Sequence, residues 1–124
     1  MIIIKYNSKN MDNEKMKKLK IQSTCVNWIK KEMPEIEGCI FAVENNYEPL
    51  KNREKTFGLV RGVSNLLIIF NGKFYGINFV NENKKQKWWS QILMENGGKY
   101  FLIEDFESFK ELIYKITKLK TNRV

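Results

Sequence analysis

The sequence contains no histidine and only two cysteines, Cys25 and Cys39, in 124 residues. Without histidine, two thiols cannot complete an ordinary four-ligand zinc site, and every mechanism that uses an imidazole base is excluded. A cysteine nucleophile needs a neighbouring base, and the sequence offers no obvious one. We therefore predict that both cysteines are buried, reduced thiols and that the chain uses no metal and no cofactor.

Long apolar runs are also missing. No stretch approaches the roughly 20 apolar residues that a membrane-spanning helix needs, and residues 1–6 lead into no small-residue cleavage site of a signal peptide. The sequence therefore predicts a cytoplasmic protein without a membrane segment. Its length and its 43% hydrophobic composition predict a single domain, residues 1–124, with one core.

Acidic residues are few compared with basic ones. The chain has 14 aspartates and glutamates against 22 lysines and arginines, which gives a formal net charge of +8. A surplus of this size favours binding to a polyanion, RNA or DNA, or to an acidic protein surface.

The clearest structural signal is a hairpin formed by residues 66–70 and 74–80. Two apolar runs flank Asn71 and Gly72, a dipeptide that favours the positive backbone dihedrals of a tight antiparallel turn. We therefore expect two adjacent strands at the centre of the chain.

The remaining elements follow from periodicity, caps and breakers. Helices are expected from Asp12 or Asn13 to about residue 33, at residues 83–96 and after Asp105. A central strand is expected at residues 38–43 and another strand at residues 99–104. Residues 1–9 should add an edge strand or form a flexible arm, and residues 121–124 a frayed tail. This order predicts an α/β fold, with a mixed sheet of about four strands flanked by helices.

Short motifs along the chain resemble one nuclease family. They are, in order, Ile21 and Gln22, Trp28, Pro34, Phe41 to Val43, Asn45, Gly58, Gly62 and Val63, Leu66, Gly72, Gly76 and Ile77, Gln86, Trp89, and Gly97 and Gly98. Through this set, residues 18–116 resemble a VRR-Nuc domain, a virus-type branch of the PD-(D/E)xK nuclease superfamily. The resemblance implies a restriction-endonuclease-like core.

The sequence departs from this family where the family has its catalytic residues. Asn65 stands for the metal-binding aspartate of G-V-P-D-L, Asn78 and Val80 for the glutamate and lysine of I-E-x-K, and Lys18 for a glutamate on the first helix. With Gln86 of the Q-x-x-W motif, these are the positions of a degenerate site.

The loss of acids has a direct chemical consequence. Phosphodiester hydrolysis in this superfamily is understood to need a hard cation that carboxylates hold, and a neutral amide cannot neutralise such an ion. Val80 can neither orient a water nor stabilise a charged transition state. We therefore predict a pseudonuclease with no catalytic residues. Residual catalysis by a displaced acid is the open alternative, with Glu82 as the best candidate, because residues 78, 80 and 82 share a face if the strand extends that far.

Basic residues and one tryptophan are the candidate contacts for nucleic acid. The long irregular stretch 44–59 interleaves basic residues with Tyr47 and Phe57, which suits a single strand. Three lysines gather near the start of the helix at residues 83–96, where phosphate binds well. Trp88 should be more exposed than Trp89, which shares a helix face with Gln86. The candidates are Lys18, Lys51, Arg53, Lys55, Arg61, Lys84, Lys85, Lys87 and Trp88. The competing interpretation is a solvated face for the lysines, including Lys15 on the first helix, and core packing for the aromatic residues.

These observations lead to one main hypothesis and two alternatives. The main one is a catalytically inactive nuclease-fold protein that binds nucleic acid, with RNA or single strands favoured. Its setting would be a phage or mobile-element inhibitor (an anti-CRISPR) of a CRISPR–Cas or other nuclease-based defence complex, as monomer or homodimer. The alternatives are a protein-binding module or accessory subunit in recombination or repair, and a residual metal-dependent nuclease.

Overall fold

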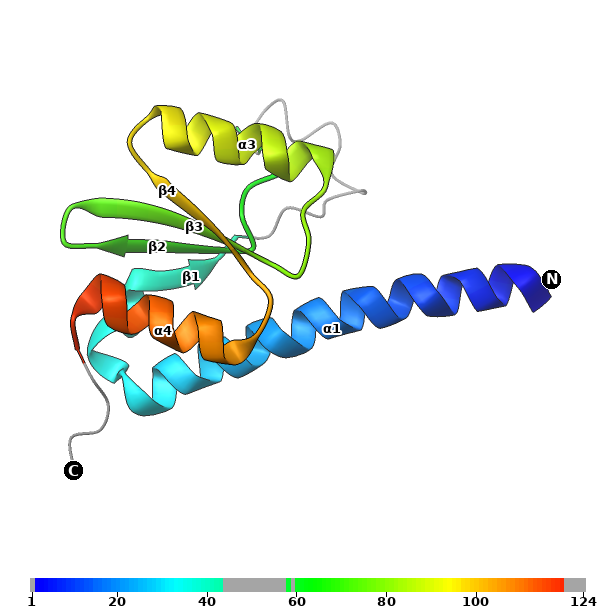
Figure 1. Ribbon diagram of the computed structural model, residues 1–124, viewed down its shortest axis with the longest axis horizontal. Helices are drawn as coiled ribbons and strands as arrows, with labels where there is room; N and C mark the ends of the chain where they lie inside the picture. The colour runs from blue at the N-terminus through cyan, green and yellow to red at the C-terminus, as the bar shows by residue number, and fades with distance from the viewer. Residues whose placement is uncertain (1, 44–57, 59, 120–124) are drawn as a thin grey trace.

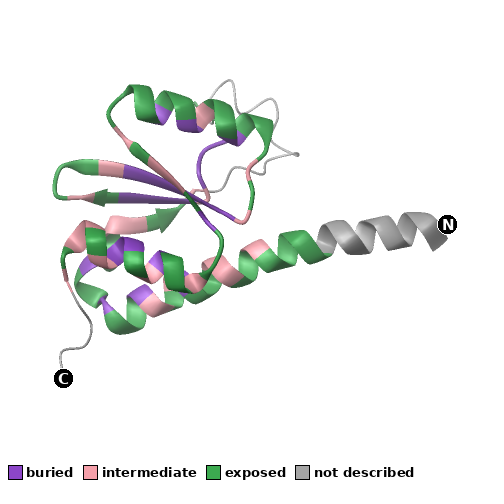
Figure 2. Cartoon of the chain, viewed as in Figure 1, coloured by how far each residue is buried: buried purple, intermediate pink, exposed green. Residues whose placement is uncertain are grey.

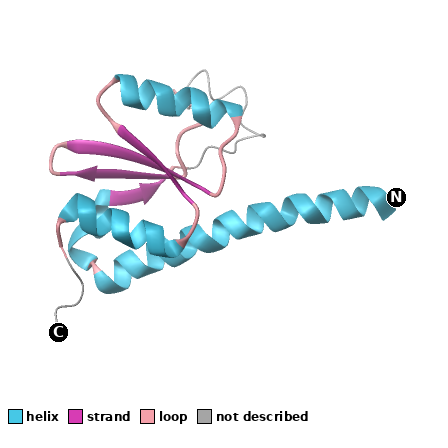
Figure 3. Ribbon diagram, in the orientation of Figure 1, coloured by secondary structure: helices cyan, strands magenta, loops and turns pink. Residues whose placement is uncertain are grey.

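The computed structural model describes residues 2–43, 58 and 60–119, with side chains from residue 13 onward. The chain forms a mixed α/β fold with a four-stranded sheet and helices on both of its faces (Figures 1 and 3). The elements are α1 (Ile2–Glu32), the 3₁₀-helix η1 (Pro34–Cys39), β1 (Ile40–Ala42), β2 (Leu66–Phe70), β3 (Lys73–Phe79), α3 (Lys84–Glu95), β4 (Lys99–Ile103) and α4 (Phe106–Thr117). The predicted fold class, a mixed sheet of about four strands flanked by helices, is confirmed.

The sheet has the strand order β1-β2-β3-β4. Its first three strands are antiparallel, whereas β4 runs parallel to β3 after the crossover through α3. The predicted hairpin is confirmed, since Asn71 and Gly72 connect β2 and β3 with φ values of 52° and 79°. Both values lie in the left-handed region that a two-residue hairpin turn requires.

The two faces of the sheet carry different layers. Helices α1 and α4 cover one face and α3 covers the other (Figure 1). The first face holds the main core, in which Ile77 and Phe79 of β3 contact Ile29 of α1 and Phe109 of α4 within one buried cluster. Figure 2 shows buried residues on the strands and on α1, α3 and α4. Since side chains alternate along a strand, the intervening residues, among them Asn78, point toward α3.

The edge strand predicted at the N-terminus is not formed, and the first helix begins earlier than Asp12 or Asn13. Residues 2–4 are helical, since α1 begins at Ile2 and continues for 31 residues without a break. No glycine or proline interrupts residues 2–33, and helix extension is cooperative, so the β preference of three isoleucines is overridden. The N-terminal part of α1 therefore projects beyond the rest of the molecule (Figure 1). No helix in the described part of the chain combines the length and apolar character needed to cross a membrane.

The strand predicted at residues 38–43 is shorter than expected and lies elsewhere in the sheet. Pro34 ends α1 as predicted, but η1 uses the chain as far as Cys39, so β1 begins only at Ile40. It is an edge strand, with Phe41 and Ala42 exposed, and not a central one. The prediction failed because apolar residues on both faces of a short strand do not by themselves distinguish a central strand from an edge strand.

The predictions for the C-terminal half are confirmed. Asn83 caps α3 and Asp105 caps α4, each by accepting a backbone hydrogen bond in the first helical turn. Trp28 packs edge-on against Phe106 and Phe109, and so fixes α4 against α1. The predicted frayed tail, residues 121–124, lies outside the described residues.

Candidate functional site

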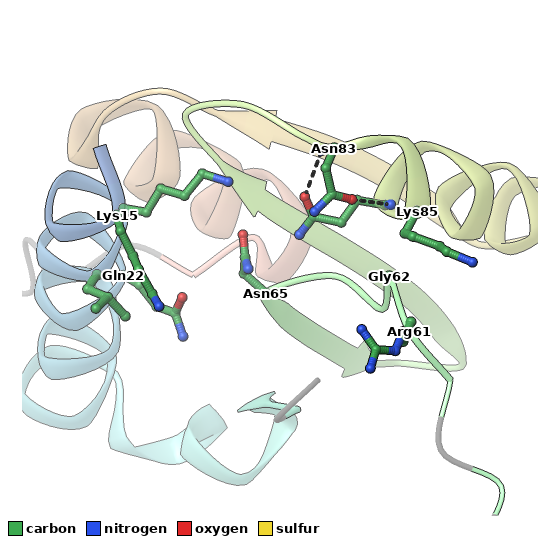
Figure 4. A pocket seen from close by; sticks show the side chains of 10 residues that line it. Lys15, Gln22, Arg61, Gly62, Asn65, Asn83 and Lys85 are labelled. Atoms are coloured by element: carbon green, nitrogen blue, oxygen red, sulfur yellow. Dashed lines mark hydrogen bonds between the residues drawn. The ribbon is translucent and has the colours of Figure 1, made fainter. Parts of the chain in front are cut away.

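A cleft of about 410 Å³ lies between α1, the segment before β2 and the start of α3 (Figure 4). Among the described residues, four cationic side chains line it, and the other polar side chains on its wall are amides. The lining residues are Lys15, Lys18, Leu19, Gln22, Arg61, Gly62, Asn65, Asn83, Lys85 and Gln86. No carboxylate among the described residues lines this cationic cleft. Such a wall attracts anions and offers little to a metal cation.

Gly62 allows two sides of the cleft to meet. Its φ is 94°, and a Cβ atom there would lie 2.2 Å from the backbone oxygen of Lys85. Only glycine therefore fits, and the contact holds Arg61 beside the first turn of α3. Figure 4 shows Lys15 and Gln22 approaching from α1 on the opposite side.

A capping box fixes the first turn of α3. The Asn83 side chain accepts from the backbone N–H of Gln86 at 2.8 Å, and Gln86 Oε1 accepts from the backbone N–H of Asn83 at 3.1 Å. This reciprocal pair satisfies two of the amides that a helix start leaves without partners. It also leaves the Nε2 group of Gln86 available to donate to the sheet.

The floor of the cleft is a network of amides. Asn78 is fully buried, and its Oδ1 accepts from the backbone N–H of Asn65 at 2.9 Å and from Nε2 of Gln86 at 3.3 Å. In return, Oδ1 of Asn65 accepts from the backbone N–H of Phe79 at 3.1 Å. The two asparagines thus join the start of β2 to the end of β3, and their Oδ1 atoms are occupied by protein donors.

The network continues from Asn78 to an acid. Nδ2 of Asn78 donates to the Tyr100 hydroxyl at 2.9 Å, and that hydroxyl donates to Oε2 of Glu82. Burial, and secondly the hydrogen bond to Glu82, raise the pKa of Tyr100 well above its ordinary value. The phenol therefore stays protonated and can donate to Glu82 at any ordinary pH.

Glu82 does not reach this position along a strand. β3 ends at Phe79, and Val80 has a φ of 69°, so the alternation that would place residues 78, 80 and 82 on one face is broken. Glu82 is instead linked to Asn78 by two hydrogen bonds that share the Tyr100 hydroxyl. Val80 packs against the main core.

The structure brings three of the nine predicted contact residues into the cleft: Lys18, Arg61 and Lys85. Asn65 and Gln86 lie there as well, while Asn78 is buried below them. Lys84 and Lys87 are exposed on α3 without lining the cleft. Lys51, Arg53 and Lys55 lie outside the described residues.

Sequence reasoning missed several residues of the site. Lys15 enters the sequence prediction only as part of a solvated helix face, although its spacing of three from Lys18 places both on one side of α1. Asn83 and Tyr100 were missed because their roles depend on a cap and on strand register. The register pairs Gly76 with Tyr100 and Asn78 with Leu102, so Tyr100 and Asn78 point to the same face.

The electrostatics of the cleft are consistent with an anion site. Partial burial lowers the pKa of Lys18 from its ordinary value, and the nearby carboxylate of Glu14 opposes this effect. A bound anion would favour the protonated form of the lysine. Within the described part of the chain, no three side chains of the types Cys, Asp and Glu lie close enough together to hold a metal ion.

Comparisons of this chain with models of protein families, with curated proteins and with solved structures found no match in any of the three.

Proposed function

We propose that the chain is a catalytically inactive nuclease-fold protein, related to the VRR-Nuc domains, that binds nucleic acid in the cationic cleft. The order of elements supports the relation. The β2–β3 hairpin carries Asn65 and Asn78, and α3, with Gln86 near its start, leads into the parallel strand β4. The sequence motifs of that family follow the same order, which is what a restriction-endonuclease-like core requires.

The observation that carries the proposal is the pairing of a cationic wall with an amide floor. Lys15, Lys18, Arg61 and Lys85 surround a space from which carboxylates of the described residues are missing. Phosphate groups bind to lysine and arginine in such surroundings, and release of counterions drives the association. The two Oδ1 atoms at the family's acidic positions accept hydrogen bonds from the protein and contribute no charge to a metal site.

Labelled oligonucleotides test this proposal directly. Fluorescence anisotropy with single- and double-stranded RNA and DNA, across a salt series and with and without Mg²⁺, should show magnesium-independent binding. Gels of the same samples should show intact oligonucleotides. Failure to bind any of the four at low micromolar concentration in moderate salt would refute the proposal, and so would cleavage.

Charge variants locate the binding site. Lys18→Gln and Lys85→Gln should each weaken binding and reduce the slope of log K against log salt by about 0.7 for a single strand, the contribution of one phosphate contact. Lys115→Gln is the matched control, because this exposed lysine lies on α4 and does not line the cleft. An equal effect of all three substitutions would mean that net charge, and not the cleft, governs binding.

Binding without cleavage suits the inhibitor role predicted from the sequence. A protein that covers nucleic acid and leaves it intact can block a CRISPR–Cas or other nuclease-based defence complex. In a cleavage assay with such a complex, Lys18→Gln and Lys85→Gln should lose inhibition in parallel with binding.

The surface of α1 favours a second candidate, a protein-binding module. Met16 and Leu19 are exposed beside Lys17 and Lys20 on the part of α1 that precedes its packed segment. An acidic partner with apolar side chains would match this surface. The discriminating result is a protein complex that survives treatment with nuclease, combined with weak and fully salt-screened binding of oligonucleotides.

A further inference from the structure

A stripe of large side chains extends along α3 from the cleft. Lys85, Trp88, Trp89 and Ile92 are spaced at i, i+3, i+4 and i+7, so they lie on one flank of the helix. The buried residues of α3, which are Gln86, Ser90 and Leu93, mark the side that faces the sheet. The stripe therefore begins with a residue of the cleft wall and continues over the surface beside it.

The stripe is exposed where it leaves the cleft. The Trp88 side chain is 53% exposed, Ile92 is also exposed, and Trp89 is half-buried between them. Exposing tryptophan to water is unfavourable, and large exposed aromatic groups are common where a protein binds a partner. Lys85 and Trp88 are three residues apart, which places their Cβ atoms about 5–6 Å from each other.

We propose that this stripe is a platform on which unpaired bases stack, so that the cleft prefers single-stranded nucleic acid to a duplex. The inference rests on the proposed function, because it takes the strand in the cleft as given. A phosphate held by Lys85 brings the adjoining base within reach of the Trp88 ring. Bases stack on aromatic side chains through their π faces, and every base has one, so this contact needs no particular sequence.

Duplexes gain nothing from the platform. Their bases are already stacked on each other, so a duplex offers phosphates and groove edges to the protein but no base faces. The cations of the cleft therefore serve both kinds of nucleic acid, and Trp88 serves only the single strand. The chemical class of ligand is a single strand of RNA or DNA with at least one unpaired base beside the bound phosphate.

Substitution of Trp88 tests the platform. Trp88→Ala should weaken binding of a single strand by about 5- to 150-fold, the range that one base–aromatic stack supplies. The affinity for a duplex of the same sequence should change by less than about two-fold and the salt slope should stay the same, because no phosphate contact is lost. Trp88→Phe should recover part of the single-strand affinity, which a merely structural role would not predict.

Met94 provides the matched control. It is 51% exposed on the same helix, but it lies six residues from Trp88 and outside the stripe. Met94→Ala should leave both affinities unchanged, and thermal melting of both variants should show that α3 is intact.

The outcomes separate the two proposals. If the unmodified protein binds no oligonucleotide, the proposed function fails and the platform fails with it. If it binds, but Trp88→Ala weakens single strand and duplex equally or Met94→Ala matches its effect, the platform is refuted and the cationic cleft stands. A single-strand-specific loss that phenylalanine partly restores supports the platform.

Discussion

The amide of Asn78 should be required for the stability of the fold, and Asn78→Asp tests this with almost no change in shape. The side chain is fully buried, accepts two hydrogen bonds through Oδ1 and donates one through Nδ2 to Tyr100. The substitution keeps the acceptor and replaces the donor with a second oxygen. The Tyr100 hydroxyl, which already donates to Glu82, then faces two acceptors with one proton.

The free-energy cost of this substitution has two parts. Leaving a buried polar group without a partner costs about 1–3 kcal/mol, and more where a charge is involved. The introduced carboxylate would also lie two hydrogen bonds from the carboxylate of Glu82, within a partly buried network. A fully buried charge without a partner costs about 3–5 kcal/mol, so for this partly buried network we expect the lower end of that range, about 3 kcal/mol, at neutral pH. For a domain of this size, that lowers Tm by roughly 10 °C or more.

The loss of stability should grow as the pH rises. Burial raises the pKa of the introduced carboxyl above its unfolded value of about 3.9, so the folded state binds more protons than the unfolded state as pH rises from about 4. Stability relative to the unmodified protein therefore falls with rising pH and recovers toward pH 4, where the protonated acid can donate to Tyr100. Urea unfolding at several pH values measures this difference.

Asn65→Asp is the matched control at the second asparagine of the network. Asn65 is only partly buried, and its Oδ1 accepts from the backbone N–H of Phe79, which a carboxylate oxygen does equally well. We expect a change below about 1 kcal/mol. If Asn78→Asp is as mild as Asn65→Asp, or if its cost does not change between pH 4 and pH 7, the network described here does not stabilise the fold.

Three further predictions concern the glycine at the cleft, its lysine and the thiols. Gly62→Ala should destabilise the protein by at least about 2 kcal/mol, because strain at positive φ adds to a collision with the backbone of α3. Gly72 also has a positive φ but open space around it, so Gly72→Ala should cost only about 1 kcal/mol, and urea unfolding of both variants compares the two costs. Since burial lowers the pKa of Lys18 from 10.5, oligonucleotide affinity should begin to fall at a pH below the ordinary lysine range. Lys18→Arg keeps its charge in this pH range, so it should flatten the fall of affinity that fluorescence anisotropy measures there. A thiol reagent should modify the half-buried Cys39 in the folded protein and Cys25 only on unfolding, because Cys25 is fully buried and burial raises the pKa of its thiol to about 12. Equal modification rates for the two cysteines would contradict this packing.

The sequence was sufficient to predict elements whose signals are local. The Asn71–Gly72 turn and the helix that follows Asp105 each depend on a few neighbouring residues, and each lies where it was expected. The start of α1 could not be predicted in the same way, because the preference of three isoleucines for a strand competes with extension of a helix that begins far along the chain. The position of β1 at the edge also depends on the whole sheet.

In the candidate site, too, local signals could be predicted from the sequence, whereas contacts between distant segments could not. Lys18 and Lys85 were predicted from charge, and Asn65 and Asn78 from the resemblance to VRR-Nuc domains, but their convergence depends on three segments that are distant in sequence. The contact between Gly62 and the backbone of Lys85 is what brings Arg61 to α3, and no periodicity predicts it. The role of Tyr100 could be predicted only from the register of the parallel pair β3–β4, and the sequence does not specify that register.

Under the proposed relation to the VRR-Nuc domains, the hydrogen bonds around Asn78 bear on how an acidic catalytic site would become a binding site. Replacing an acid with an amide removes charge, and the amide also gains a donor, which here is used by Tyr100. Once Tyr100 and Glu82 are arranged around that donor, a carboxylate at the same position meets an acceptor and a nearby negative charge instead of a cation. Such an exchange would therefore be difficult to reverse by one substitution. Introducing aspartate at both Asn65 and Asn78 would cost stability without creating a metal site, unless Tyr100 and Glu82 were changed with them.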